Sequence, residues 1–237
     1  MAMVGQSVSG VALAPEEQEP PSRRQRGRPR AATDAARRAE ILAQARLIFL
    51  ERGYAGTTTE LVATSCHISK QTLYRLFPSK TELFRALVVD HRSTMLKLPL
   101  ERSDLPPAEA IAAIFRVGLS ASADRERLAF LDFAMREART FPEIGQMVRQ
   151  DGGEASRALL AGWLEAQHAA GILTIEDADS AAHMLMDIIF GAMMHLPGGP
   201  PDGPQRAQRD AHLRRCIRIF IEGVRPREPA APAAPHA

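Results

Sequence analysis

Apolar residues recur three and four positions apart along most of this 237-residue chain, and this spacing constrains its fold more than any other feature. Such spacing places apolar side chains along one face of an α-helix. The alternation of apolar and polar residues that marks a β-strand is nearly absent, and aromatic residues make up only 5% of the chain. The sequence therefore predicts an all-α fold of about nine helices.

Charge is distributed unevenly along the chain. Residues 1–97 contain fifteen Lys and Arg against nine Asp and Glu, whereas residues 98–237 contain fifteen against nineteen. A basic segment joined to an acidic one indicates that the first part meets a polyanion and the second does not. A charged face that is only solvated and has no partner would give the same counts. The sequence motifs are therefore needed to distinguish a polyanion-binding segment from such a face.

Composition and helix-end signals divide the chain into four parts. Residues 1–32 are rich in Pro, Gly and Arg, which is typical of a disordered basic arm. Residues 33–97 predict a three-helix head of the helix-turn-helix kind, followed by a linking helix. Residues 98–225 open with a proline-rich joint and predict a bundle of longer helices, and residues 226–237 predict a disordered tail.

The stretch HISKQTLYRLFPSKTELF, residues 67–84, contains two helix starts. Ser69 is placed to cap a helix that ends near Leu76, and Ser79 forms a capping box with Glu82 for the next helix. A helix of about eight residues is unstable alone in water, so it must pack on its neighbours. Two short helices in succession predict a helix-turn-helix, whose second helix enters the major groove of DNA.

The polar side of this short helix carries chemistry that suits DNA. Gln71 can pair with adenine through two hydrogen bonds, and Thr72 can contact the methyl group of thymine. Tyr74 can donate its hydroxyl to a phosphate, and the N–H groups at the helix N-terminus favour an anion. We therefore expect DNA contacts from Ser69, Lys70, Gln71, Thr72, Tyr74 and Arg75.

Residues 53–84, GYAGTTTELVATSCHISKQTLYRLFPSKTELF, resemble the DNA-binding signature of the TetR/AcrR repressors without a gap. The resemblance implies a three-helix head whose third helix reads DNA, with phosphates held by Thr58, Tyr74 and Lys80. His67 stands where the family commonly has glycine. A positive φ angle at that position costs a residue with a side chain about 1 kcal/mol.

The predicted arm contains RRQRGRPR, residues 23–30, which resembles an AT-hook. Arg26 and Arg28, held extended around Gly27 and Pro29, can follow the narrow minor groove of A/T-rich DNA. A solubilising tail would have a similar composition. An architectural protein that binds DNA through the hook alone is therefore an alternative to a sequence-specific regulator.

The second half resembles the regulatory domains of AcrR-type and AefR-like members, in REARTFPEIGQMVRQ and EDADSAAHMLMDIIFGAMM within residues 129–223. That layout implies a homodimer, in which the last two helices face their copies and two heads read a palindromic operator. The expected interface consists of Leu185, Ile188, Ile189, Ala192, Ile217, Phe220 and Ile221.

A pocket for a small apolar effector is expected inside the same bundle. Its predicted lining consists of Phe115, Phe133, Met147, Trp163 and His183. The wider set of candidates adds Leu119, Phe130, Met135 and Met186, with His168 as an alternative to His183 for hydrogen bonding. Each of these residues could equally be ordinary core, and a regulator that responds to no ligand is a further alternative.

Signatures of catalysis are missing from the sequence: it has no GxGxxG, P-loop, HExxH or GxSxG motif. Cys66 and Cys216 are far apart, which predicts neither a disulfide framework nor a zinc site and suits a reducing cytoplasm. No apolar run approaches the roughly 18 residues of a membrane span. We expect a cytoplasmic transcriptional repressor without catalytic residues, metal or cofactor. The residues do not identify its operator, its regulated genes or its effector.

Overall fold

The computed structural model describes residues 30–102, 104–194 and 203–226, and within these ranges it contains helices and no strand. The helices are α1 Arg30–Gly56, α2 Thr59–Ser65, α3 Lys70–Leu76, α4 Lys80–Met95, α5 Pro107–Ile114, α6 Ala121–Thr140, α7 Pro142–Met147, the π-helical segment η1 Val148–Glu154, α8 Ala155–Ala169, α9 Ala178–Met194 and α10 Gly203–Gly223. Because α7, η1 and α8 follow one another directly, the described ranges hold nine helical rods. The predicted all-α fold is confirmed.

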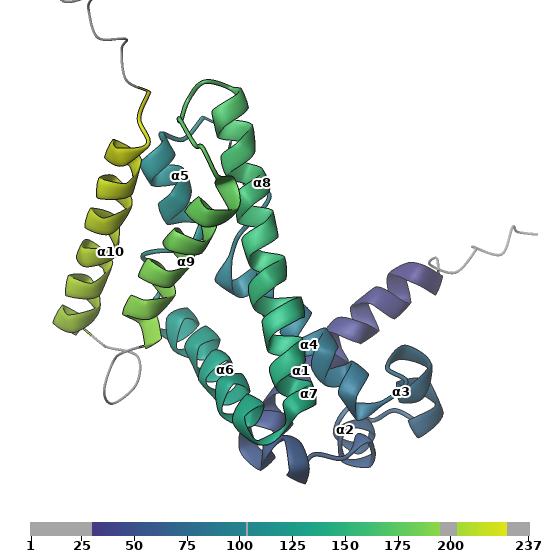
Figure 1. The fold of residues 1–237 in the computed structure, drawn as a ribbon. Coiled ribbons are helices and arrows are strands. Elements are labelled where there is room, and N and C mark those ends of the chain that lie inside the picture. The colour runs from purple at the N-terminus through teal and green to yellow at the C-terminus, as the bar shows by residue number, and fades with distance from the viewer. Residues whose placement is uncertain (1–29, 103, 195–202, 227–237) are drawn as a thin grey trace, which may run out of the picture.

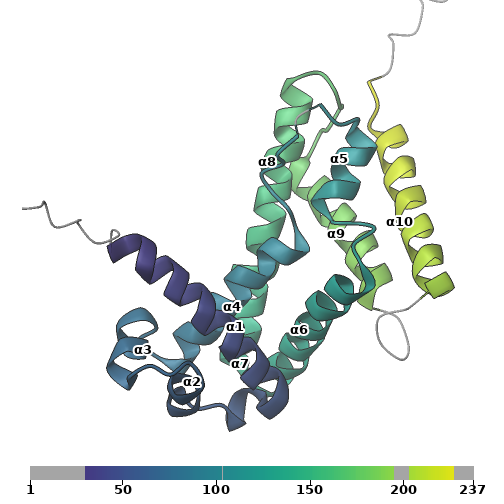
Figure 2. The same cartoon turned by 180° about the vertical axis from the view of Figure 1, so that it is seen from behind.

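Helices α1 to α4 form a head at one end of the molecule, and the remaining helices form the bundle (Figure 1). Helix α10 lies along the outer edge of the bundle, on the side away from α3, and the view from behind agrees (Figure 2). Arg26 and Arg28 of the predicted arm lie outside the described residues.

Three hydroxyl groups start the helices of the head. The side chains of Thr58, Ser69 and Ser79 each accept a hydrogen bond from the backbone N–H three residues on, at 3.1, 3.1 and 3.0 Å. Each bond satisfies an N–H group that has no partner within the helix. The predicted starts of α3 and α4 are therefore confirmed.

Two residues of the head adopt the left-handed backbone region. Gly53 has φ 73° and bends α1 shortly before the helix ends at Gly56. His67 has φ 51° in the turn between α2 and α3, as expected for a residue at the family's glycine position. Both angles direct the chain into the next helix of the head.

The apolar residues form two cores. The core of the head surrounds the fully buried Phe49, Leu73 and Phe84, and it extends into the bundle through Phe130 and Phe133 of α6. The second core joins α5, α8, α9 and α10. Helix α6 therefore connects the head with the rest of the bundle.

The long rod from α7 to α8 contains a change of helix type. The sequence raises the possibility of an interruption at Gly152 and Gly153, and the structure places both residues in the π-helical segment η1 without breaking the rod. A π-helical turn widens the backbone locally and occurs frequently at functional sites.

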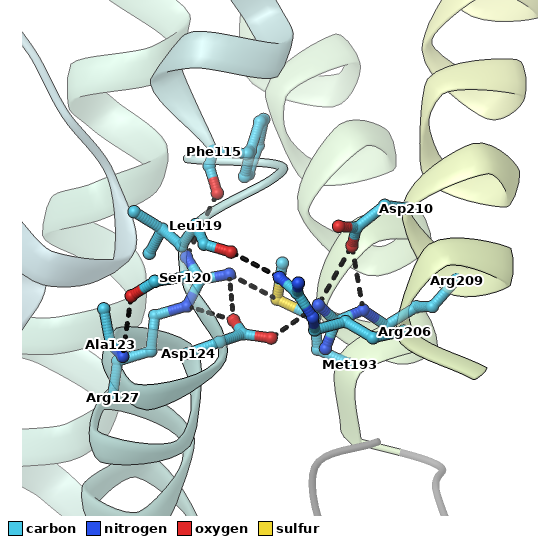
Figure 3. Close-up of polar contacts among 10 residues, drawn as sticks. All are labelled: Phe115, Leu119, Ser120, Ala123, Asp124, Arg127, Met193, Arg206, Arg209 and Asp210. Atoms are coloured by element: carbon cyan, nitrogen blue, oxygen red, sulfur yellow. Dashed lines mark hydrogen bonds and ion pairs between the residues drawn. The ribbon is translucent and has the colours of Figure 1, made fainter. Parts of the chain in front are cut away.

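A buried ionic cluster joins α6 to α10 (Figure 3). Asp124 of α6 accepts hydrogen bonds from Arg127, at 2.8 Å from its Nε, and from Arg209 of α10. Arg127 also donates to the carbonyl of Phe115, at 3.2 Å, just beyond the end of α5. The side chains of Asp124 and Arg127 are only 2% and 3% exposed, so the two charges compensate each other inside the protein.

Candidate DNA-reading surface and effector cavity

Helix α3 is fixed to the head by one side and exposed on the other. Leu73 is fully buried, and Leu76 and the following Phe77 are also in the core of the head. Gln71, Tyr74 and Arg75 lie on the opposite, exposed side. A seven-residue helix is too short to be stable alone, so the buried side explains why α3 persists.

Carboxylates hold both basic residues of this exposed face. Lys70 pairs with Glu60 of α2 at 2.7 Å, and Arg75 donates two hydrogen bonds to Asp34 of α1, at 2.7 and 2.9 Å. The hydrogen bond from Lys70 lowers the pKa of Glu60, and the bond to Asp34 raises the pKa of Arg75. DNA phosphates would compete with these carboxylates for the same cations.

The hydroxyl groups of the predicted site are partly engaged within the head. The Tyr74 and Thr59 oxygens lie 2.8 Å apart, which positions the Tyr74 ring while 42% of that residue remains exposed. Ser69 Oγ and Thr72 Oγ1 are 2.9 Å apart at the start of α3, and Thr58 remains exposed at the start of α2. The Tyr74 hydroxyl therefore lies at the start of α2, and the Ser69 and Thr72 hydroxyls lie at the start of α3.

Lys80 has a structural contact that the sequence did not predict. Its Nζ donates to the carbonyl of Tyr54 at 2.9 Å and lies 4.3 Å from the centre of the Tyr54 ring. These contacts fix the first residue of α4 against the end of α1. A phosphate contact from Lys80 would have to use its remaining N–H groups.

An apolar cavity of about 410 Å³ lies between α4, α6, η1 and α9. This volume is within the range of about 300–1,000 Å³ that is typical of small-molecule sites. Its apolar lining includes Val88, Met95, Phe130, Met135, Met186 and Phe190.

His91 of α4 forms part of the cavity wall. Arg46 Nη1 lies 3.3 Å from its Nδ1, and because a guanidinium only donates, the proton of a neutral ring is assigned to Nε2. Burial, followed by the charges of Arg46 and Arg127, lowers the pKa of His91 to about 3. The ring is therefore neutral, and within the described part of the chain its buried Nε2 has no hydrogen-bond partner.

The structure corrects the predicted cavity lining. Phe133 and Met147 pack in the core of the head, and Phe115 and Trp163 in the second core. His183 is exposed on α9, 3.8 Å from Asp187, and it borders a surface groove beside the cavity instead of the cavity itself. Helical spacing identifies residues that point inward, but not those that border a void. Of the wider predicted set, the residues that do line the cavity are Phe130, Met135 and Met186.

Several cavity residues were not predicted from the sequence. Among them are His91 and Arg92 of α4 and Arg149 of η1. The glycine pair at residues 152–153 was the one signal available, because two adjacent glycines inside a long helix suggest a special backbone or a close approach.

The predicted dimer interface also needs correction. Leu185, Ile189, Ile217 and Ile221 are buried in the core of the single chain, at 8% exposure or less. Ile188 is 38% exposed, and Ala192 and Phe220 are half-buried. The most exposed large apolar side chains in the described parts of α9 and α10 are Met184 at 54% and Ile219 at 63%, and Ile219 was not predicted from the sequence. A helix that is apolar on nearly all sides does not reveal which side its own core covers.

Two other features are absent from the described ranges. No group of three His, Cys, Asp or Glu residues in the described parts of the chain is arranged to hold a metal ion. Likewise, none of the described helices has the length and apolar character to cross a membrane.

A capped helix-turn-helix with an exposed polar face, carried by a helical bundle, defines the class of DNA-binding regulators. Residues 41–87 match the family model described as bacterial regulatory proteins of the tetR family, and residues 109–223 match the C-terminal domain of AefR-like transcriptional repressors. The chain belongs to the TetR family and is a helix-turn-helix, DNA-binding transcriptional regulator.

Relatives and solved structures agree with this assignment. The chain is 28% identical to RutR of Escherichia coli K12 over 208 residues, covering 81% of this chain and 92% of RutR. It is 25% identical to YvkB of Bacillus subtilis 168, an uncharacterized HTH-type regulator, over 78% of this chain and 95% of YvkB. The structure of the flavonoid-responsive regulator FrrA superposes with a TM-score of 0.60 and 26% identity, covering 82% of this chain and all of FrrA.

Proposed function

We propose that the chain acts in the cytoplasm as a homodimeric repressor that binds a palindromic operator and is released by a small effector. The observation that carries this proposal is the position of α4. Its first residue, Lys80, follows the recognition helix by one short turn, and its last turns provide His91, Arg92 and Met95 to the cavity wall. One rigid helix thus connects the DNA-reading surface with the effector cavity.

Two basic residues of α4 connect this helix to the opposite cavity wall. Arg92 donates to the carbonyl of Asp151 in η1 at 3.1 Å, and Arg85 pairs with the Asp151 carboxylate at 3.5 Å. An effector that separates η1 from α4 therefore also displaces α4 and the head. A coupling free energy of about 1–3 kcal/mol is enough to change DNA occupancy.

A dimer is supported by the outer edge of the bundle. Helices α9 and α10 expose Met184, Ile188 and Ile219 there, and a second copy would cover these side chains. A two-fold dimer presents two copies of α3 to successive major grooves, about 34–36 Å apart. In such a dimer, DNA contacts are proposed from the exposed face of α3 and from Thr58, and from Arg26 and Arg28 of the arm.

Selection of bound sequences from random DNA tests the proposal most directly. The expected product is a palindrome whose half-sites are one helical turn apart, bound by a species with twice the mass of the chain in analytical ultracentrifugation. A monomeric complex, or a selected pool without symmetry, would contradict the proposal.

Removal of residues 1–29 separates the proposed regulator from an architectural protein that uses the arm alone. The truncated chain should bind the selected palindrome more weakly and with a smaller salt dependence, but with the same base preference. Loss of all base preference would instead support the architectural alternative.

A further inference from the structure

The apolar cavity continues into a groove of about 850 Å³ on the surface of the bundle. The two share five lining residues, which are Met135, Arg149, Gly153, Met186 and Phe190. Arg149 is the only charged residue among the five. Arg149 therefore lies where the apolar cavity meets the groove.

The polarity changes along this path. The cavity is lined almost entirely by apolar atoms, and its histidine, His91, is neutral. The groove is lined by three arginines, Arg139, Arg149 and Arg157, against two carboxylates, Glu154 and Asp187. A molecule that occupies both spaces meets apolar surface at one end and an excess of positive charge at the other.

The existing partners of these arginines leave room for an anion. Arg149 lies 3.5 Å from Glu154, and their side chains are 63% and 50% exposed, so this ion pair is weak. Arg157 is held more closely by Asp179, at 2.9 Å. Arg149 can thus exchange Glu154 for another carboxylate at little cost.

We propose that the effector is an amphiphile whose apolar body fills the cavity and whose carboxylate pairs with Arg149. This inference rests on the proposed effector function of the cavity. An ion inside the cavity would lose its hydration against an almost wholly apolar lining, where Arg92 already donates to the Asp151 carbonyl. A carboxylate at the rim instead keeps water and can bind the planar guanidinium of Arg149 through two hydrogen bonds. An ammonium group at the same place would face the excess of arginines.

The position of Arg149 also links such a ligand to DNA release. Arg149 lies in η1, two residues before Asp151, which contacts α4 through Arg85 and Arg92. A carboxylate that pairs with Arg149 therefore acts on the same short segment that holds α4.

Three probes with one carbon skeleton test the inference. Binding of 4-phenylbutyrate, 4-phenyl-1-butanol and 4-phenylbutylamine to the full-length protein is measured by isothermal titration calorimetry at millimolar concentrations. The carboxylate should bind about tenfold more tightly than the alcohol, as expected for a charge-assisted hydrogen bond, and the amine should bind most weakly. The advantage of the carboxylate should decrease as salt is added.

Three variants test whether the tighter binding of the carboxylate depends on Arg149 and on the cavity. Arg149→Gln should remove the advantage of the carboxylate and leave the affinity for the alcohol unchanged. Arg136→Gln is the matched control, because Arg136 is an equally exposed arginine of α6 that lines neither space, and it should change neither affinity. Leu131→Trp places a larger side chain in the cavity wall and should weaken all three probes.

The outcomes separate this inference from the proposed function. If all three probes bind equally, or if the preference for the carboxylate survives in Arg149→Gln, the inference is overturned while the effector cavity stands. If no probe binds, or if Leu131→Trp leaves all three affinities unchanged, the effector cavity of the proposed function is overturned as well.

Discussion

The two ends of α4 contact regions that are built in different ways. The head at its start consists of helices that follow one another closely in the chain, with polar caps at Thr58, Ser69 and Ser79. The cavity at its end is enclosed by α4, α6, η1 and α9, which together extend over residues 80–194 of the chain. A DNA-reading surface can thus be specified locally, whereas a cavity depends on where long-range packing leaves space.

The largest difference between the head and the cavity is expected in how much the free energy of unfolding falls when an apolar side chain is truncated. Leu73→Ala should lower the free energy of unfolding by about 2–5 kcal/mol, because Leu73 is fully buried beneath the recognition helix. Met135→Ala, at the 40% exposed rim of the cavity, should cost less than about 1 kcal/mol. Urea denaturation of both variants measures the difference, and equal losses would show that the cavity wall is as tightly packed as the head.

Within the head, two substitutions should separate base readout from phosphate contact. Gln71→Ala should cost about 1–3 kcal/mol of discrimination at one base pair of each half-site. Tyr74→Ala should weaken DNA binding, and the loss of affinity should be about the same for every DNA sequence. Titration of the selected palindrome and of its single-base variants measures both effects. A uniform loss for Gln71→Ala would remove the proposed base contact.

At the cavity end, His91 should make stability depend on pH. Its folded-state pKa of about 3 is below the unfolded value of about 6.5, so the unfolded chain binds a proton more readily as the pH falls. The contribution of His91 is therefore present above pH 6.5 and decreases below it, by about 1 kcal/mol between pH 7 and 5.5. Urea denaturation at both pH values should give a smaller decrease for His91→Gln. An identical decrease in both proteins would contradict a buried neutral ring.

The smallest effect is expected at the carboxylates that face α3. Glu60→Gln releases Lys70 and removes a negative charge beside the DNA, so it should strengthen DNA binding by less than about 1 kcal/mol. Electrophoretic mobility shift titrations at low and high salt should show the gain mainly at low salt. Glu165→Gln, an identical charge change on the exposed side of α8, is the control and should leave DNA affinity unchanged.

The sequence predicts the head well because its signals act over a few residues. The cap at Ser69 concerns the next three residues, and the positive φ of His67 follows from a single position of the motif. For the bundle, the sequence predicted the helical architecture but not which apolar residues line the cavity or remain exposed. Leu185 and Phe115 have the apolar character that an interface or a pocket requires, but both are covered by their own chain.

The site residues of the cavity could not be recognised for the same reason. Nothing near His91 in the sequence indicates that Arg46, forty-five positions earlier, approaches its ring. Likewise, the spacing of Met and Phe residues is the same whether a side chain fills a core or borders a void. Which of the two applies depends on the relative placement of helices that the sequence does not specify locally.

The Asp124 carboxylate, which binds both Arg127 and Arg209, has a consequence for the proposed homodimer. Rotation of α6 about its own axis would carry Asp124 away from Arg209 of α10 and break the buried ion pair that joins the two helices, so this pair opposes independent rotation of α6 and α10. Helix α6 borders the cavity, and α10 forms the edge at which a second subunit is proposed. In the proposed dimer, filling one cavity would then change the affinity of the other cavity for the effector.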